Sequence, residues 1–279
     1  MTQFTNANAG ANTNGFAAGP DPRPAKKFPG LLASFLWIFL FFFLQIVCSV
    51  IALIVAIFAS GPIEEFLKNP DALVRDMSAI ALPIVWSLVV ANMLTLGGLM
   101  LYLSRHGRLD IIHFNRWSRL DFGKTLGIGI AVIIAALGFN YLYSTYIIPG
   151  VELQADLKLL FEAIPKTLFN AILLFFMVAL LAPILEEFLF RGLLQNALAA
   201  RMPVYAAIMI SAAVFSLAHV NWFAAQVEFY IFPPIFILGA AFGYLYHLTR
   251  SLRVCILLHL LNNSAALMLS FFAENTGGI

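Results

Sequence analysis

Seven long stretches without Asp, Glu, Lys or Arg constrain the fold of this chain more than any other feature. They are Phe28–Ile63, Met77–Ser104, Thr125–Val151, Thr167–Leu185, Met202–Val227, Phe229–Thr249 and Val254–Ala273. A helix needs roughly 20 apolar residues to cross the hydrocarbon core of a bilayer. Backbone amides in lipid must be satisfied within their own segment, which favours helices. The sequence therefore predicts an all-α, polytopic transmembrane helical bundle.

The composition agrees with an integral, multi-pass membrane protein. Hydrophobic residues make up 62% of the 279-residue chain and charged residues only 11%, which is too little charge for a surface that faces water. The net charge of +2 offers no basic surface for nucleic acid, so membrane lipid is the expected surrounding partner. Cys48 and Cys255 both lie in uncharged stretches and are predicted to be buried thiols.

The chain divides by composition into four parts. These are a disordered N-terminal tail (1–28), N-terminal membrane helices (29–120), a helical core that carries the unusual polar residues (121–273) and a short C-terminal tail (274–279). Segments 61–76 and 152–166 mix apolar and charged residues at helical spacing, which predicts amphipathic helices at the membrane surface.

The number of spans is predicted as seven or eight. Lys and Arg are concentrated in the second, fourth and sixth connections between the apolar stretches. Because basic loops favour the cytoplasm, the simplest arrangement has the N-terminus inside, seven spans and the C-terminus outside. Residues Thr167–Ala200 exceed the length of one crossing, and Pro183 interrupts them. A second span or half-helix in this segment would raise the number to eight.

The first group of charged residues within an apolar region is Glu186, Glu187 and Arg191. An ionisable residue inside a membrane helix costs about 2.5–3.5 kcal/mol, so each one needs a partner. Glu187 and Arg191 are four residues apart and share a helix face, where they can pair. Glu186 points about 100° away and needs another partner. Taken alone, the two glutamates also fit a helix end that reaches the lipid headgroups.

Two histidines follow at helical spacing from a second residue. Phe215 precedes His219 by four residues, so its ring is predicted to lie against the imidazole. His259 precedes Asn263 by four residues, which places two hydrogen-bonding side chains on one face. Each pair taken singly is typical of polar contacts between membrane helices.

The spacing around the turn at Arg201–Pro203 links Glu186 to His219. Glu186 lies 16 residues before Met202 and His219 lies 17 after it. In an antiparallel hairpin both residues would be roughly 25 Å from the turn and face each other. A carboxylate and an imidazole in a low-dielectric pocket form an acid/base pair that can polarise water.

The pair His259 and Asn263 could supply hydrogen-bond donors to a developing oxyanion, which completes a hydrolytic centre. The predicted depth of His259 in the membrane differs from that of Glu186. His259 follows Arg250 by only nine residues, which predicts a shallower position than that of Glu186.

Three motifs, EExxxR, FxxxH and HxxxN, occur in this order on successive apolar segments. The pattern resembles the CAAX protease and bacteriocin-processing (CPBP, or Abi) family of intramembrane endopeptidases, which includes the type II CAAX prenyl endopeptidases. The resemblance covers residues 120–272. It implies that Glu186 and His219 activate the attacking water and that His259 and Asn263 form the oxyanion hole.

The resemblance also implies that Glu187 and Arg191 hold the glutamate-bearing helix, with Phe215 in support. The family has a further aromatic position between the two histidines, for which Phe242 and Tyr246 are the candidates. The implied substrate is a peptide or protein near the membrane surface, prenylated in some relatives. The expected location is a prokaryotic cell membrane.

Alternatives remain for the cofactor and for the activity. No cofactor is favoured. Zinc, held by Glu186, His219 and His259, is the second choice, because Asn263 is a poor zinc ligand and a good oxyanion donor. The alternative function is a non-catalytic membrane scaffold or bacteriocin-immunity-type protein of the same fold. A small-solute transporter is less favoured, because the polar residues are confined to one half of the chain.

Overall fold

The computed structural model describes residues 30–60, 77–109, 122–151, 155–222 and 227–276, and these residues form helices and turns without any strand. The N-terminal tail predicted for residues 1–28, the amphipathic helix predicted for 61–76 and the end of the chain from residue 277 lie outside the described residues.

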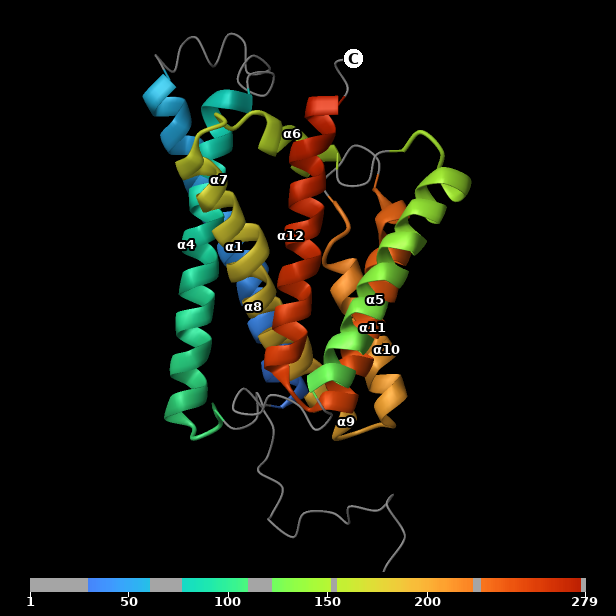
Figure 1. The fold of residues 1–279 in the computed structure, drawn as a ribbon. Helices are drawn as coiled ribbons and strands as arrows, with labels where there is room; N and C mark the ends of the chain where they lie inside the picture. Colours follow the sequence, from blue (N-terminus) through green and yellow to red (C-terminus); the bar gives the residue numbers. More distant parts are fainter. Residues whose placement is uncertain (1–29, 61–76, 110–121, 152–154, 223–226, 277–279) are drawn as a thin grey trace, which may run out of the picture.

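Within the described residues, seven helical segments run alternately in opposite directions (Figure 1). They are α1 (Leu31–Ser60), α4 (Met77–Arg105), α5 (Phe122–Leu142) with η2 (Tyr143–Ile147), a composite fourth helix, α10 (Val204–Leu217), η5 (Phe229–Ile231) with α11 (Phe232–Thr249), and α12 (Leu252–Thr276). Five of the described segments are long and apolar enough to cross a membrane, and Val204–Leu217 and Leu252–Met268 are shorter apolar helices. The predicted polytopic helical bundle is confirmed.

The composite fourth helix consists of five pieces placed end to end. In order they are α7 (Leu168–Leu174), η3 (Phe175–Leu181), α8 (Ala182–Glu186), η4 (Glu187–Gln195) and α9 (Asn196–Ala199), with η3 and η4 in the wider π-helical conformation. Residues Leu168–Ala199 thus form one continuous helix instead of two spans. Pro183 is tolerated because η3 ends directly before it, where Ala182 N–H bonds five residues back to Met177 O.

α10 is much shorter than the uncharged stretch Met202–Val227 predicted. The helix ends at Leu217, and residues 218–222 continue in turns and irregular backbone. Non-helical backbone at membrane depth is tolerated only where it is buried in protein or lines a cavity. The residues after α10 are therefore expected to line a cavity inside the bundle.

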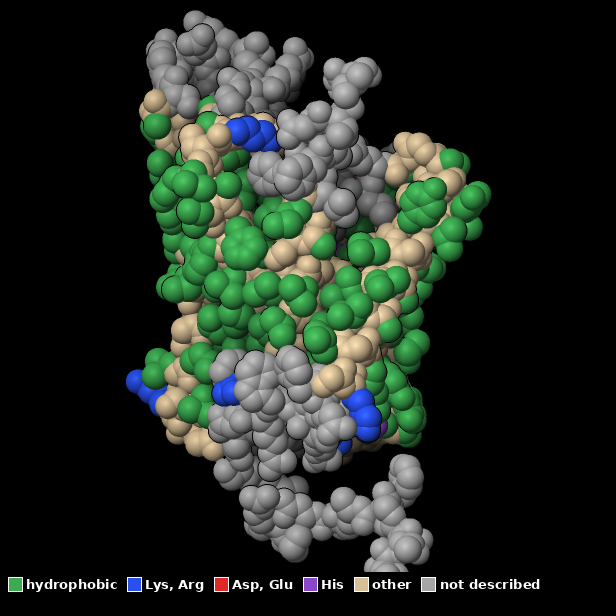
Figure 2. Space-filling view, in the orientation of Figure 1, with side chains coloured by type: hydrophobic (Ala, Val, Ile, Leu, Met, Phe, Trp, Pro, Cys, Tyr) green, Lys and Arg blue, Asp and Glu red, His purple; other side chains and the backbone are tan. Residues whose placement is uncertain are grey.

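The surface of the bundle is suited to lipid. Figure 2 shows a band of hydrophobic side chains across the middle of one face, with Lys and Arg at its two ends. Large apolar side chains project from these helices, such as Phe58 and Ile134, which are 64% and 65% exposed. An apolar surface of this extent would aggregate in water, whereas lipid solvates it.

The segment predicted as an amphipathic surface helix, 152–166, contains α6 (Ala155–Glu162). α6 lies across one end of the bundle (Figure 1). Its charged face carries the exposed pair Lys158–Glu162 at 3.7 Å, and Phe161 on its other face is buried against α4 and the fourth helix. α6 thus covers one end of the bundle, and its residue Phe161 lines the interior cavity.

Candidate functional site

A cavity of about 360 Å³ lies inside the bundle, between α4, α5, α8, η3, α10, α11 and α12. Glu186, His219, His259 and Asn263 all line it. Its volume falls within the usual range of ligand pockets, roughly 300–1,000 Å³. The four residues that the sequence singled out from three separate segments thus meet around one space.

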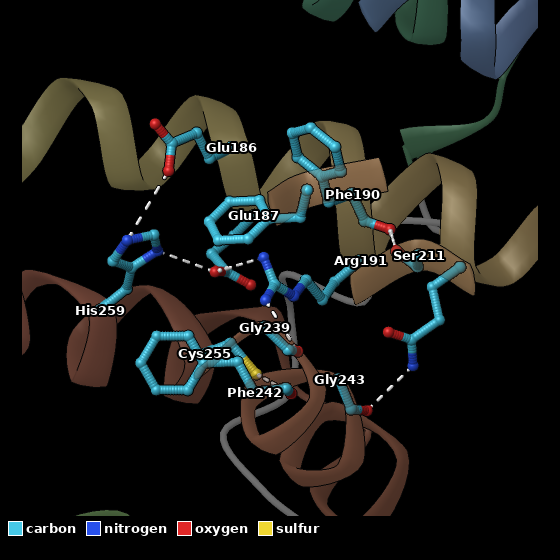
Figure 3. Close-up of polar contacts among 12 residues, drawn as sticks. Glu186, Glu187, Phe190, Arg191, Ser211, Gly239, Phe242, Gly243, Cys255 and His259 are labelled. Atoms are coloured by element: carbon cyan, nitrogen blue, oxygen red, sulfur yellow. Dashed lines mark hydrogen bonds and ion pairs between the residues drawn. The ribbon is translucent and has the colours of Figure 1, made fainter. Parts of the chain in front are cut away.

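Glu186 faces His259 across this cavity. Glu186 Oε2 lies 3.6 Å from His259 Nε2, as the dashed line in Figure 3 marks. This separation is too long for a direct hydrogen bond, and polar groups so placed are often bridged by water. The sequence paired Glu186 with His219, which lines the same cavity, but did not identify His259 as its nearest partner.

Glu187 holds both Arg191 and His259. Its Oε1 lies 3.0 Å from Arg191 Nη1 and 2.9 Å from His259 Nδ1, and the two side chains of the Glu–Arg pair are 0% and 1% exposed. The predicted pairing of Glu187 with Arg191 is confirmed. An ionised carboxylate can only accept hydrogen bonds, so His259 Nδ1 carries the hydrogen and donates it. This contact turns His259 Nε2 toward Glu186 (Figure 3).

The guanidinium of Arg191 is fixed from several sides. Its Nη2 donates to Gly239 O at 3.1 Å, and its central carbon lies 4.6 Å from the Phe215 ring and 5.8 Å from the Phe242 ring. Phe242 is fully buried and its ring centroid is 5.3 Å from that of His259. Of the two aromatic candidates, Phe242 is therefore the one beside the polar cluster.

The other candidate, Tyr246, lies away from the cavity and accepts a hydrogen bond from Asn196 Nδ2 at 2.8 Å. One turn closer to the site, Gln195 Nε2 donates to Gly243 O at 2.9 Å. A Cβ atom on Gly243 would lie only 2.8 Å from Gln195 Oε1, so a larger residue there would displace the end of the Gln195 side chain. The hydrogen bonds to Gly239 O and Gly243 O hold α11, the helix that carries Phe242, against η4.

His219 is held by the end of α10. Phe215 O loses its usual helical partner there, because His219 N bonds to Ser216 O instead, at 3.0 Å. His219 Nδ1 takes its place and donates to Phe215 O at 2.8 Å, with the two rings 4.5 Å apart. Since a carbonyl only accepts, Nδ1 carries the hydrogen and the neutral ring keeps a lone pair on Nε2. The predicted contact between the Phe215 ring and the His219 imidazole is confirmed, with the two ring planes tilted by 53°.

Asn263 is anchored on the fourth helix through a carbonyl that Pro183 leaves free. In the wide turn of η3 each carbonyl bonds to the N–H five residues later, and for Val178 that residue is Pro183, which has no N–H. Asn263 Nδ2 donates to Val178 O at 3.0 Å, and its Oδ1 accepts from Asn262 Nδ2 at 3.2 Å. The amide is thereby oriented, and its second N–H is left over.

The second wide segment, η4, accounts for part of the difference between the distances of Glu186 and His259 from their neighbouring turns. η4 occupies nine of the residues between Glu186 and the turn at Arg201. A helix closed by i→i+5 bonds has more residues per turn, so it rises less per residue than the 1.5 Å of an α-helix. Glu186 therefore lies nearer to the turn than the α-helical count predicts.

The zinc set considered from the sequence does not form a ligand group. Glu186, His219 and His259 line one cavity, but over the described ranges no three His, Cys, Asp or Glu side chains are placed to hold a metal ion.

Two further polar residues line the cavity, Asn140 on α5 and Asn262 on α12. The sequence alone indicated no functional residue in the first 150 positions. The only signal for Asn140 is an amide within the uncharged stretch Thr125–Val151, which is common in membrane helices and does not indicate function by itself.

The helices and the cavity define a polytopic membrane protein with a buried carboxylate–imidazole centre. Residues 168–265 match the model of the Rce1-like family, described as type II CAAX prenyl endopeptidases. The matched stretch begins with α7, ends within α12 and includes all three motifs, and it confirms the resemblance stated above. At the level of the family the match supports an intramembrane CAAX-type protease. No curated protein and no solved structure matches the chain.

Proposed function

We propose that this chain is an intramembrane endopeptidase in which side chains, without a metal, activate the attacking water. The observation that carries the proposal is the meeting of Glu186, His219, His259 and Asn263 around one cavity, within a segment that matches a family of CAAX endopeptidases. Glu186 and His219 act on the water, and His259 and Asn263 act on the substrate carbonyl.

Glu186 serves as the general base. Its carboxylate lines the cavity and makes no hydrogen bond within the described part of the chain, so its lone pairs are available to a water molecule. His219 Nε2 offers a second acceptor that orients the same water. As the water oxygen bonds to the carbonyl carbon of the scissile peptide, its proton passes to Glu186 and the carbonyl oxygen becomes an oxyanion.

The oxyanion is stabilised by the second N–H of Asn263 and by His259, whose Nε2 lies on the cavity side. In this proposal His259 is an imidazolium throughout the step, so that Nδ1–H is donated to Glu187 and Nε2–H to the oxyanion, and no proton moves onto the ring. When the tetrahedral intermediate collapses, the C–N bond breaks and Glu186 returns its proton to the leaving nitrogen. The products are a carboxylate and an amine.

The rest of the cavity favours an apolar substrate. Its wall includes Leu88, Phe161, Leu238 and Leu267, so the polar centre lies at one side of a largely hydrophobic space. Together with the description of the matched family, this lining supports a lipidated peptide or protein, with a prenylated CAAX end as the first candidate.

The proposal is tested with purified protein in lipid nanodiscs and an internally quenched peptide that carries a farnesylated cysteine in a C-terminal CAAX sequence. We expect one cleavage site by mass spectrometry and an unchanged rate after treatment with chelators. A rate that is lost with chelator and restored by zinc would overturn the metal-free mechanism. A folded protein that cleaves neither this peptide nor its unlipidated form would favour the scaffold function.

The anchoring of Asn263 by Val178 O leads to a prediction for Pro183→Ala. The new N–H at position 183 competes for Val178 O, so Asn263 loses its fixed orientation. We expect kcat to fall about tenfold with little change in KM, and the thermal stability to stay equal or rise, because a helix-interior proline is removed. Measurement of kcat, KM and Tm against Asn263→Ala checks this. A Pro183→Ala enzyme with the wild-type kcat would show that the carbonyl does not position the amide.

A further inference from the structure

Asn140 is the feature of the cavity that the proposed mechanism does not use. It lies on α5 and lines the cavity together with Ala136, one turn earlier. α5 lies outside the matched family segment, which begins at residue 168. Any role of Asn140 therefore has to follow from the structure of this chain and not from the family motifs.

The Asn140 amide is half-buried and forms no hydrogen bond to any residue that the structure describes. Other asparagines in the bundle do: Asn92 accepts from Gln45 at 3.0 Å, Asn170 donates to Pro165 O at 2.8 Å, and Asn196 donates to Gly192 O at 2.9 Å. An amide in a largely apolar cavity is unfavourable when it has no hydrogen-bond partner there. This cost is met when a ligand in the cavity supplies the hydrogen bonds.

A peptide main chain matches the chemistry of this amide. A carboxamide offers one acceptor oxygen and two donor hydrogens, which complement the N–H and C=O of a peptide group. A peptide that enters an apolar cavity brings main-chain groups that must be satisfied there. Apart from the four residues used in catalysis, the polar side chains on the wall are Asn140 and Asn262, and Asn262 already donates to Asn263.

The position of Asn140 along α5 gives its offset, parallel to the helices, from the oxyanion residue Asn263. α5 and α12 begin at the same end of the bundle, at Phe122 and Leu252 (Figure 1). Asn140 is seven residues further along its helix than Asn263, which corresponds to an offset of roughly 10 Å along the helix axis. An extended peptide advances about 3.3 Å per residue, so this separation equals up to about three substrate residues.

We propose that Asn140 is a substrate-binding residue whose carboxamide holds the main chain of the peptide, up to about three residues from the bond that is cut. The inference rests on the proposed peptidase function. It assigns to α5 a part of the cavity wall that selects for an extended peptide, on a different helix from Glu186.

The test uses Asn140→Leu, which keeps the size of the side chain and removes its hydrogen bonds. With the farnesylated quenched peptide we expect KM to rise about tenfold while kcat stays within about twofold. The same peptide should bind about tenfold more weakly to Asn140→Leu/Glu186→Gln than to Glu186→Gln, as measured by fluorescence anisotropy without turnover. Tyr141→Leu is the matched control, because Tyr141 is the next residue on α5 and is 66% exposed.

The outcomes separate this inference from the proposed function. If the wild type cleaves the peptide and Asn140→Leu has the wild-type KM and affinity, the role of Asn140 is overturned. The proposed peptidase function is then unaffected. A fall in kcat together with a fall in Tm would assign Asn140 to helix packing and would also overturn it. A wild-type protein that neither binds nor cleaves the peptide removes both proposals.

Discussion

Replacement of Glu186 by Gln is expected to lower kcat by roughly 10²–10⁴-fold. The amide keeps the shape of the side chain but cannot take a proton from water, and a positioned general base contributes roughly 10²–10⁴-fold. Folding should be unaffected, because Glu186 has no hydrogen-bond partner in the described structure and its closest ionisable neighbour, His259 Nε2, is 3.6 Å away. The measurement is the rate of peptide cleavage in nanodiscs, with Tm recorded on the same sample.

Glu162→Gln is the matched control for this result. Glu162 is an exposed carboxylate at the end of α6 and pairs with Lys158 outside the cavity. We expect this variant to cleave at the wild-type rate. A Glu186→Gln enzyme that keeps more than a tenth of the wild-type kcat would exclude Glu186 as the base and would shift attention to His219.

Replacement of Arg191 by Met is expected to destabilise the protein by about 3–5 kcal/mol. Arg191 is 1% exposed and pairs with Glu187, which is 0% exposed, so the variant leaves a buried carboxylate without its cation. The hydrogen bond to Gly239 O and the contact with the Phe215 ring are lost as well. The change in unfolding free energy is measured by denaturant titration in detergent.

The double variant Arg191→Met/Glu187→Leu separates the charge effect from the loss of packing. Replacing both partners of a buried ion pair by apolar residues is often nearly neutral for stability. We therefore expect the double variant to recover most of the stability lost in Arg191→Met. Its activity should remain low, because His259 Nδ1 no longer has the Glu187 acceptor that orients it. Arg191→Met with wild-type stability would show that the buried pair does not support the fold.

The sequence predicted best what depends on neighbouring residues in one helix. The uncharged stretches located the long helices, because an uncharged stretch long enough to cross the bilayer core is rare outside membranes. The pairs Glu187–Arg191 and Phe215–His219 followed from the four-residue spacing alone. Each of these contacts is present in the structure.

What the sequence did not predict depends on contacts between distant segments or on departures from α-helical geometry. His259 and Glu187 are 72 residues apart, and their hydrogen bond requires that α12 pack against the fourth helix. The wide turns of η3 and η4 have no reliable sequence pattern. The proline that seemed to interrupt the helix instead frees a carbonyl for Asn263. Asn140 was missed because an isolated amide in an apolar stretch is not distinctive.

A double-mutant cycle of Glu186→Gln and His219→Ala tests most directly whether the two side chains act on the same water. Residues that work as a unit in one step are strongly non-additive, because losing either already removes the shared function. We predict that kcat in the double variant is within about threefold of the slower single variant. Reductions that multiply, so that the double variant is slower than the wild type by the product of the two single reductions, would contradict a shared water and with it the proposed mechanism.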